Sequence, residues 1–280
     1  MLKNNSISFV LLALAVLLSR LPFLDAGYGA EEDSWGIALA AWSTATTGVY
    51  EASRLPGHPV QEFVLQLLWG CGPFVFNLLS ALCSVIAVVF FALVLKELKF
   101  KHWLLASFAF GFTPIVFISS TYTIDFMWTE MFVMTAFYLL LKKQLIPAGI
   151  LIGLSAGCRI TSAGMLLPFA IMLWEQQNIK DSIKNIFKVS APAIFTTIVC
   201  FIPIIKTYGS GFFIFYDQFP YPPISKVIYK AVLGVFGFVG TITLLWTVII
   251  ILIKRKQEQH EQLFETGISK QQLLGWLSVI

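Results

Sequence analysis

The sequence predicts an all-α, polytopic transmembrane protein of about eight spans. Hydrophobic residues make up 58% of the chain and charged residues only 12%, whereas a soluble domain carries about 25% charged residues. Apolar runs of about 17 to 25 residues, long enough to cross a bilayer, recur along the chain. The 26 phenylalanines and 8 tryptophans suit lipid-facing helices and interfacial belts. Membrane lipids are therefore the expected surroundings, and a net charge of +4 gives no reason to expect a nucleic-acid partner.

Eight apolar segments are the expected spans. They cover residues 7–24, 74–95, 103–119, 126–141, 145–157, 161–174, 189–205 and 228–253. The first is expected to remain uncleaved, because no small-x-small signal-peptidase site follows it closely. Arg159 lies between two short segments and argues against one long helix there. A tight helical hairpin or a re-entrant pair is expected instead.

The residues after the last span differ in character. Residues 256–272 are charged and are interpreted as a cytoplasmic linker. The final residues 273–280, LLGWLSVI, are typical of the start of a further span that stops in mid-helix. We therefore expect the sequence to be a truncated part of a longer protein.

The distribution of charge predicts which side of the membrane each loop faces. With the N-terminus in the cytoplasm and alternating spans, most of the 19 lysines and arginines fall in cytoplasmic loops, as the positive-inside rule requires. Most of the 15 acidic residues fall on the other side. The agreement depends on counting 145–174 as two crossings, which supports that split. We therefore expect a multi-pass protein of the plasma (inner) membrane whose large first loop, residues 25–73, is extracytoplasmic.

This first outer loop carries the clearest chemical signal. Glu31, Glu32 and Asp33 are adjacent at a membrane boundary, where carboxylates are costly unless they have a function. An aromatic and apolar face follows at helical spacing, on Trp35, Leu39 and Trp42. It predicts an interfacial helix that Gly48 can end, and an N-cap role in that helix is the structural alternative for Asp33. The turn SRLPGHP and a second short helix, VQEFVLQLLWG, complete the loop.

A second carboxylate is expected on the same side of the membrane. Asp125 lies at the outer start of the fourth span and shares a helix face with Trp128 and Thr129. An ionisable residue at the edge of a membrane helix is a functional candidate, and helix capping is again the alternative. Glu130 is rotated away from Asp125 and is the weaker candidate.

Together these features resemble the GT-C superfamily of membrane glycosyltransferases, especially its protein O-mannosyltransferase-like and aminoarabinose-transferase-like branches. The resemblance rests on the acidic first loop, its helix and Pro/Gly turn, the outer Asp, and the segment AGILIGLSAGCRITSAGMLLPF; it covers most of residues 1–255. It implies a catalytic module that takes sugar from a polyprenyl-phosphate donor on the extracytoplasmic face. A carboxylate of the first loop is expected at the active centre. The family order Asp-Glu-aromatic is replaced here by Glu31-Glu32-Asp33 and Trp35, and we favour Asp33, then Glu32.

Sugar transfer from such a donor requires a base and a cation. A carboxylate at a low-dielectric boundary is a good proton acceptor, and the candidates are Asp33, Glu32 and Asp125. The phosphate leaving group requires positive charge, which a guanidinium supplies in a bidentate geometry. The candidates for binding the donor phosphate are Arg54, Arg159 and His58. A solvated loop charge is the alternative for Arg54, and a snorkelling anchor is the alternative for Arg159. No cofactor is required, although a divalent cation held by Asp33 and Asp125 is compatible with the chemistry.

A second predicted outer loop supplies further substrate-binding candidates, and the glycines and cysteines are expected to have structural roles. The aromatic loop KTYGSGFFIFYDQFPYPPISK either covers the site, stacks on sugar rings or lies in the interface. Its candidate substrate residues are Tyr216, Asp217 and Tyr221. Gly149, Gly153 and Gly157 recur every four residues and predict close helix packing. The four cysteines lack metal-binding spacing and are interpreted as small buried hydrophobic residues.

Other classes of membrane protein fit the sequence less well than the transferase. A secondary transporter places polar residues near the midplane in paired halves, and no internal repeat is seen. A polysaccharide polymerase or a flippase-like protein is expected to line an outer cavity with more cations. A structural scaffold is the remaining class. The sequence favours a glycosyltransferase whose acceptor is a lipid, a glycan or a protein hydroxyl.

Overall fold

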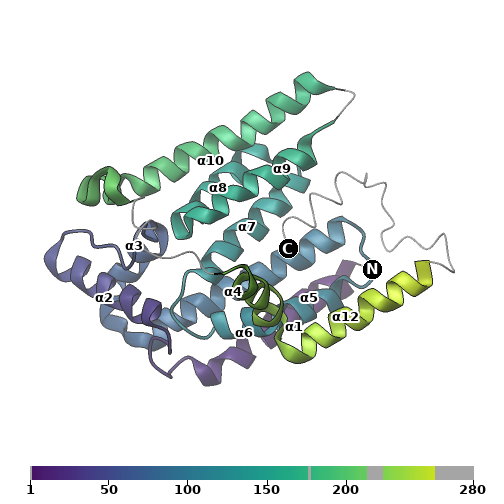
Figure 1. Cartoon of the computed structure of the whole chain (residues 1–280), viewed down its shortest axis with the longest axis horizontal. Helices are drawn as coiled ribbons and strands as arrows, with labels where there is room; N and C mark the ends of the chain where they lie inside the picture. The colour runs from purple at the N-terminus through teal and green to yellow at the C-terminus, as the bar shows by residue number, and fades with distance from the viewer. Residues whose placement is uncertain (1, 176–177, 213–222, 256–280) are drawn as a thin grey trace.

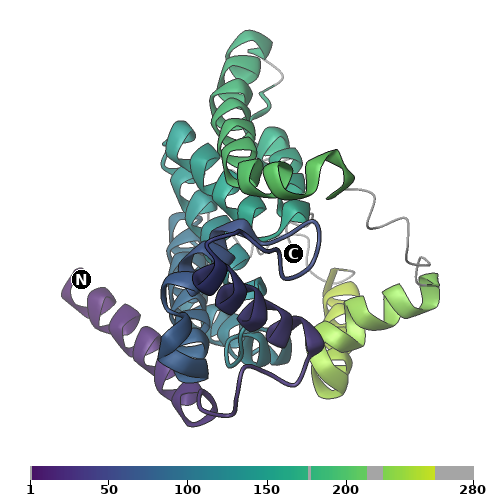
Figure 2. The same ribbon diagram turned by 90° about the vertical axis from the view of Figure 1, so that its left-hand side faces the viewer.

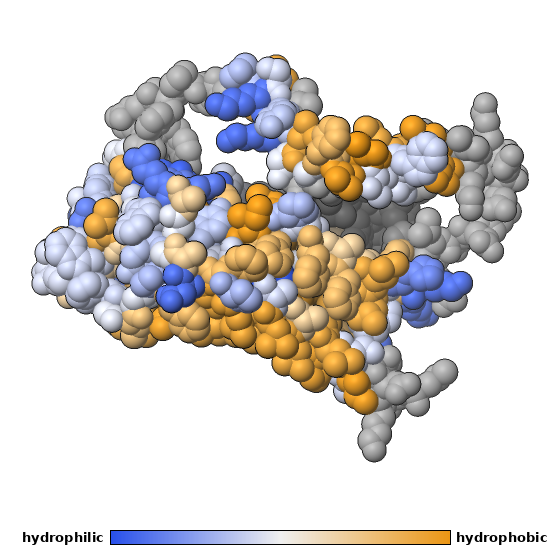
Figure 3. All heavy atoms as spheres, turned by 90° about the horizontal axis from the view of Figure 1, so that it is seen from below, coloured by the Kyte–Doolittle hydropathy of each residue, from blue (hydrophilic) through white to orange (hydrophobic). Residues whose placement is uncertain are grey.

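A computed structural model describes residues 2–175, 178–212 and 223–255, and every regular element in these ranges is helical (Figure 1). The all-α prediction is therefore confirmed for the described part of the chain. Three of its helical segments are long and apolar enough to cross a membrane: Ser6–Phe23, Trp69–Glu97 and Ile179–Phe212. Four shorter apolar helices accompany them, and a broad hydrophobic band covers the face shown in Figure 3.

The segment between α1 and the next long helix, predicted as an extracytoplasmic loop, contains the two expected helices. After α1 (Leu2–Arg20) and a 3-10 turn, η1 (Leu21–Phe23), the loop forms α2 (Glu32–Thr47) and α3 (Pro59–Leu67). Gly48 ends α2 in the left-handed conformation, with φ of 71°, which confirms its predicted role. The predicted aromatic face of α2 is exposed, at Trp35, Leu39 and Trp42, while Ile37 and Ala41 are buried beneath it.

The central helices follow the predicted segments with one break. A 3-10 turn, η2 (Trp69–Cys71), leads into α4 (Gly72–Glu97). The segment expected as one span at 103–119 is divided into α5 (Trp103–Gly111) and α6 (Pro114–Ser119). Pro114 explains the division, because proline lacks an N–H and disfavours helical backbone at Thr113, whose ψ is 132°.

The next helices meet at Arg159. α7 (Phe126–Leu141) has the predicted bounds, and α8 (Leu145–Cys158) ends where Arg159 adopts an extended backbone, with φ of −152°. The chain continues as a 3-10 segment, η3 (Ile160–Met165), and α9 (Leu166–Leu173). The predicted interruption of 145–174 at Arg159 is therefore confirmed.

The last described helices are longer or more irregular than expected. α10 (Ile179–Tyr208) begins ten residues before the predicted span, with Asn178 as an N-cap that accepts from the Asp181 backbone N–H. The segment predicted as a span at 228–253 forms α11 (Ile224–Tyr229), a π-helix η5 (Lys230–Gly234) and α12 (Val235–Arg255). α12 is kinked at Gly237, whose φ is 67°.

A core of α4, α7, α8, α9 and α10 holds the described molecule together. Its buried side chains include Val94, Phe137, Ile152, Phe169 and Val189. The predicted close packing of the α8 glycines is confirmed against α10. An ideal Cβ on Gly153 would lie 2.5 Å from Thr196 Cβ and 2.7 Å from the Ala193 carbonyl oxygen. Only a residue without a side chain therefore allows this approach.

A buried amide ties the loops at the site end to this core. Asn77, on α4, donates to the carbonyl oxygens of Leu24 and Gly27 at 2.9 and 2.7 Å. Its own oxygen accepts from Thr123 at 2.8 Å. The entry to α2 and the turn before α7 are thereby fixed to one helix. Asp33 and Asp125, which follow these two segments, are placed at the same end of the molecule.

Candidate functional site

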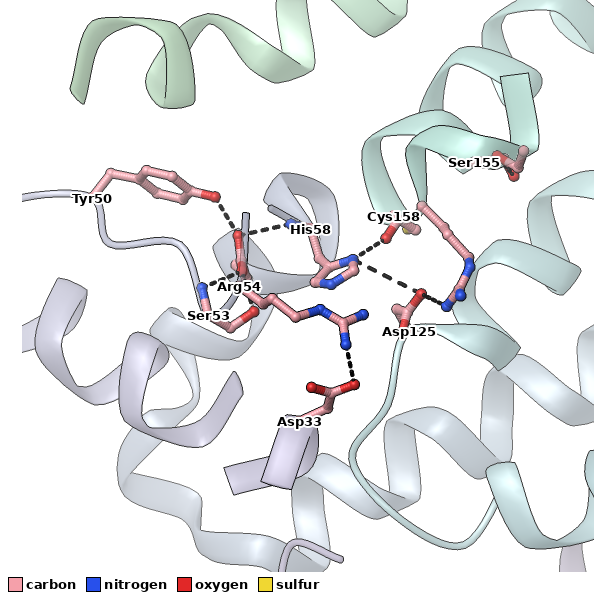
Figure 4. A network of polar contacts seen from close by, with 11 residues as sticks. Asp33, Tyr50, Ser53, Arg54, His58, Asp125, Ser155 and Cys158 are labelled. Carbon is pink, nitrogen blue, oxygen red and sulfur yellow. Dashed lines mark hydrogen bonds and ion pairs between the residues drawn. The ribbon is translucent and has the colours of Figure 1, made fainter. Parts of the chain in front are cut away.

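Two carboxylates and two arginines form ion pairs at one end of the molecule (Figure 4). Asp33, in the first turn of α2, lies 2.5 Å from Arg54 in the loop between α2 and α3. Asp125, at the start of α7, lies 2.9 Å from Arg159, which follows α8. The first pair is open to solvent, with about two fifths of each side chain exposed, whereas the Asp125 side chain is only 2% exposed. Each guanidinium thus already has a counter-charge.

His58 lies beside the second pair in a defined orientation. Its Nδ1 is 2.6 Å from the Cys158 carbonyl oxygen and 3.8 Å from Asp125 Oδ2. A carbonyl oxygen only accepts hydrogen bonds, so Nδ1 carries the hydrogen in this contact. In the neutral ring Nε2 is then left as an acceptor. Figure 4 shows this second nitrogen turned toward the Arg54 side chain.

The loop that carries Arg54 and His58 is organised around a buried carboxylate, Glu62. This residue, on α3, is 3% exposed and accepts from four donors. They are the Tyr50 hydroxyl, the Ser53 N–H and hydroxyl, and the His58 N–H. Burial, followed by the charge of Glu62, raises the pKa of the Tyr50 phenol, which therefore stays protonated and donates. Glu62 positions the loop and is not itself exposed to a ligand.

A pocket opens between the two arginines. Its lining residues come from the Arg54 loop and from the chain after α8: Arg54, Pro56, Gly57, His58, Arg159, Ile160 and Thr161. Gly57 has φ of 93°, a conformation that favours glycine, and a Cβ there would lie 2.5 Å from the Ile204 side chain. Two guanidiniums and a histidine acceptor make this pocket suited to an oxyanion that also carries a hydroxyl group.

Five of the sequence-predicted candidates are brought together by the fold. Asp33, Arg54, His58, Asp125 and Arg159 lie within the network of ion pairs and the pocket just described. The remaining four candidates are not part of this network of described residues. Glu32 is exposed beside Asp33 and makes no side-chain hydrogen bond or ion pair with the described residues. Tyr216, Asp217 and Tyr221 lie outside the described residues.

The two aspartates lie differently with respect to their helix starts. The N-cap of α2 is Glu31, so Asp33 lies inside the first turn, where its carboxylate pairs with Arg54. Asp125 occupies the N-cap position of α7 but makes no side-chain capping hydrogen bond. A negative charge still interacts favourably with the positive end of each helix. In both cases the guanidinium is the main partner.

The described residues contain no preformed metal-binding site. No group of three or more His, Cys, Asp or Glu side chains converges there in a way that could hold an ion. The two candidate ligands, Asp33 and Asp125, each pair with an arginine instead.

Several residues that shape the site were missed by sequence reasoning. Glu62 and Tyr50 were not identified because nothing in their local pattern indicates burial together. Tyr122 was missed as well. Burial raises the pKa of its phenol, followed by the negative charge of Glu31 and, to a smaller extent, of Asp125 and Asp33. This phenol therefore stays protonated near the carboxylates of the site.

Comparison with protein-family models, curated proteins and solved structures gives no match.

Proposed function

We propose that the protein is a membrane glycosyltransferase that moves a sugar from a polyprenyl-phosphate donor to an acceptor hydroxyl outside the cytoplasm. The observation that supports this most directly is the pocket between Arg54 and Arg159, with a carboxylate beside each guanidinium and the His58 acceptor between them. A phosphate bound there would be matched by two guanidinium forks. The apolar helices around the site suit a donor whose tail stays in the bilayer.

The pairing of Asp33 with Arg54 suggests how binding and proton transfer are coupled. In this proposal the donor phosphate displaces Asp33 from Arg54, because its two non-bridging oxygens match the guanidinium fork and the Asp33 pair is open to solvent. When Arg54 turns to the phosphate, the Asp33 carboxylate is released. It then accepts the proton of the acceptor hydroxyl while that oxygen bonds to the sugar anomeric carbon. The bond from that carbon to the phosphate oxygen breaks, and its electron pair leaves with the lipid phosphate.

The second ion pair has a different role in this proposal. Asp125 is nearly inaccessible and holds both Arg159 and the Nδ1 edge of His58. It therefore fixes the direction of the Arg159 guanidinium, which also lies 4.6 Å above the Phe126 ring. His58 Nε2 is free to accept a hydrogen bond from a sugar or acceptor hydroxyl. We place Arg54 and Arg159 as phosphate ligands, Asp33 as the base and Asp125 as the residue that positions Arg159.

The test is sugar transfer from a panel of polyprenyl-phosphate sugars in membranes that contain the protein. Asp33→Asn is expected to lower the transfer rate by about 10²- to 10⁴-fold, the usual contribution of a general base. Glu32→Gln is the matched control, because Glu32 is adjacent and exposed; it should retain at least about half of the rate. Equal transfer by the Asp33 variant and the wild type would remove Asp33 from the reaction. Transfer from no donor in the panel, with uptake of a polar solute into vesicles, would favour a transporter instead.

A further inference from the structure

Three lysines lie along the first half of α10, at the end of the molecule away from the candidate site. Lys180, Lys184 and Lys188 are four residues apart, so they form one stripe on the helix surface. All three are exposed, and none pairs with a carboxylate of the described residues. The one acidic residue within this stretch, Asp181, hydrogen-bonds with Asn178 at the helix start. The stripe is therefore a local concentration of positive charge.

The packing of α10 on α8 fixes how far the lysine stripe lies from the candidate site along the helix axis. The two helices run parallel, because Gly149, Gly153 and Gly157 of α8 approach Val189, Ala193 and Cys200 of α10 in turn. Cys158 and Arg159, which contribute to the site, are level with Cys200. Lys184 precedes Cys200 by 16 residues and Lys180 by 20, which at 1.5 Å per residue corresponds to about 24 and 30 Å.

This separation matches the thickness of the hydrocarbon core, about 30 Å. If the site lies at one membrane boundary, Lys180 and Lys184 lie at the headgroups of the opposite boundary. Lys188 lies one turn deeper, from where a long side chain reaches the headgroups by snorkelling. Figures 1 and 2 show the first turns of α10 extending away from the site end of the bundle.

The residues next to the stripe are apolar and exposed. Ile179, Ile183 and Phe187 have exposed fractions of 54%, 57% and 69%. Each lies one residue before a lysine, on the neighbouring part of the helix surface, whereas Ser182 and Val189 face the protein and are buried. An apolar strip beside a cationic strip is the pattern of a helix surface that contacts acyl chains and headgroups together.

We infer that Lys180, Lys184 and Lys188 form a binding surface for anionic phospholipid headgroups on the membrane face opposite the candidate site. The partner is a lipid phosphate because the lysines lack a counter-charge among the described residues, lie at headgroup depth and adjoin side chains suited to acyl chains. The inference does not depend on the proposed glycosyl transfer, since it concerns a different surface and a different ligand.

The experiment uses the full chain reconstituted in phosphatidylcholine vesicles with spin-labelled phosphatidylglycerol or spin-labelled phosphatidylcholine. Electron paramagnetic resonance gives the fraction of each labelled lipid that is motionally restricted by the protein. Each lysine near the surface favours an anionic lipid by up to about fivefold. We expect the wild type to select phosphatidylglycerol by at least about threefold. The triple variant Lys180→Gln, Lys184→Gln and Lys188→Gln should lower that selectivity to near one.

Two further variants test whether the selectivity depends on positive charge at this part of α10. Replacing the three lysines with arginine should preserve the selectivity, since charge and length are retained. Replacing Lys206, Lys226 and Lys230 with glutamine removes the same total charge away from the stripe and should leave most of the selectivity. The inference is overturned if the wild type shows no selectivity, if the α10 glutamine variant retains it, or if both glutamine variants lose it equally.

Discussion

Glu62 is the residue on which the geometry of the candidate site depends most directly. It accepts from Tyr50, Ser53 and the His58 backbone N–H at a buried position. In Glu62→Gln the charge is lost and an amide NH₂ faces donors, so we expect the free energy of unfolding to fall by about 2–3 kcal/mol, the scale of charge-assisted hydrogen bonds. Thermal unfolding in detergent measures this. Glu51→Gln, at an exposed position, is the control, and equal melting temperatures for the two variants would contradict the role of Glu62.

Tyr50 should make the stability of the protein sensitive to alkaline pH. Burial and the charge of Glu62 raise the pKa of this phenol above its usual value of 10.0. The folded state therefore keeps a proton that the unfolded state loses above about pH 10, so stability falls as pH rises through that range, by at most about 1.4 kcal/mol per pH unit. The melting temperature of the wild type should fall more steeply than that of Tyr50→Phe between about pH 9.5 and about pH 11, the window in which an ordinary phenol titrates. Parallel curves would show that Tyr50 does not titrate in this way.

The residue types at the site were predictable, but their partners were not. The adjacent acids before α2, the turn SRLPGHP and the Asp at the start of α7 identify candidates because charges at a membrane boundary are costly. Which arginine meets which aspartate depends on how α2, α3 and α8 pack together. The burial of Glu62 is likewise a tertiary property, since its sequence neighbourhood resembles that of an exposed helix residue.

The contact of α8 with α10 sets the spacing between the site and the rest of the bundle. In Gly153→Ala the added Cβ would meet Thr196 Cβ and the Ala193 carbonyl oxygen, at 2.5 and 2.7 Å, so the helices must separate. We expect a loss of about 1–3 kcal/mol, the range for overpacking, seen as a lower melting temperature. Gly164→Ala is the matched control, because a Cβ there meets nothing within 4 Å. If both variants had the same melting temperature, the close approach of α8 to α10 would not be needed for stability.

At the level of elements, hydropathy located most helices and local chemistry determined their ends. The bounds of α7 and the break at Arg159 follow from the sequence directly. The predicted span 103–119 follows hydropathy alone, whereas Pro114 favours the division that the structure has at Thr113. The predicted span begins at residue 189, ten residues after the start of α10, because three lysines lower the hydropathy of the residues between. They are helical because Asn178 caps them and because Ser182 and Val189 pack on the bundle.

Across the whole described molecule, the acidic residues of the candidate site lie at one end, and the lysine stripe of α10 lies at the other. The Asp33 and Asp125 pairs are level with the C-terminal end of α8, whereas Lys180 and Lys184 project beyond its N-terminal end. The separation of acids and lysines in the structure corresponds to the predicted separation of acidic and basic loops along the sequence. It agrees with the positive-inside rule if the lysine end faces the cytoplasm. The number of spans and the side on which the site lies stay predictions.

The orientation can be measured with single cysteines at the two ends. In a Cys71→Ser background, which removes the exposed native thiol, Glu51→Cys places a thiol in the loop of the candidate site and Lys184→Cys places one in the lysine stripe. A membrane-impermeant maleimide should label Glu51→Cys in right-side-out vesicles and Lys184→Cys only in inside-out vesicles. The background without either new cysteine is the control for the remaining thiols. The reverse pattern would place the site in the cytoplasm, where a donor of the proposed kind is not expected. Labelling of both positions from one side would contradict the placement of the two ends at opposite membrane faces, and with it the depth assigned to the lysines.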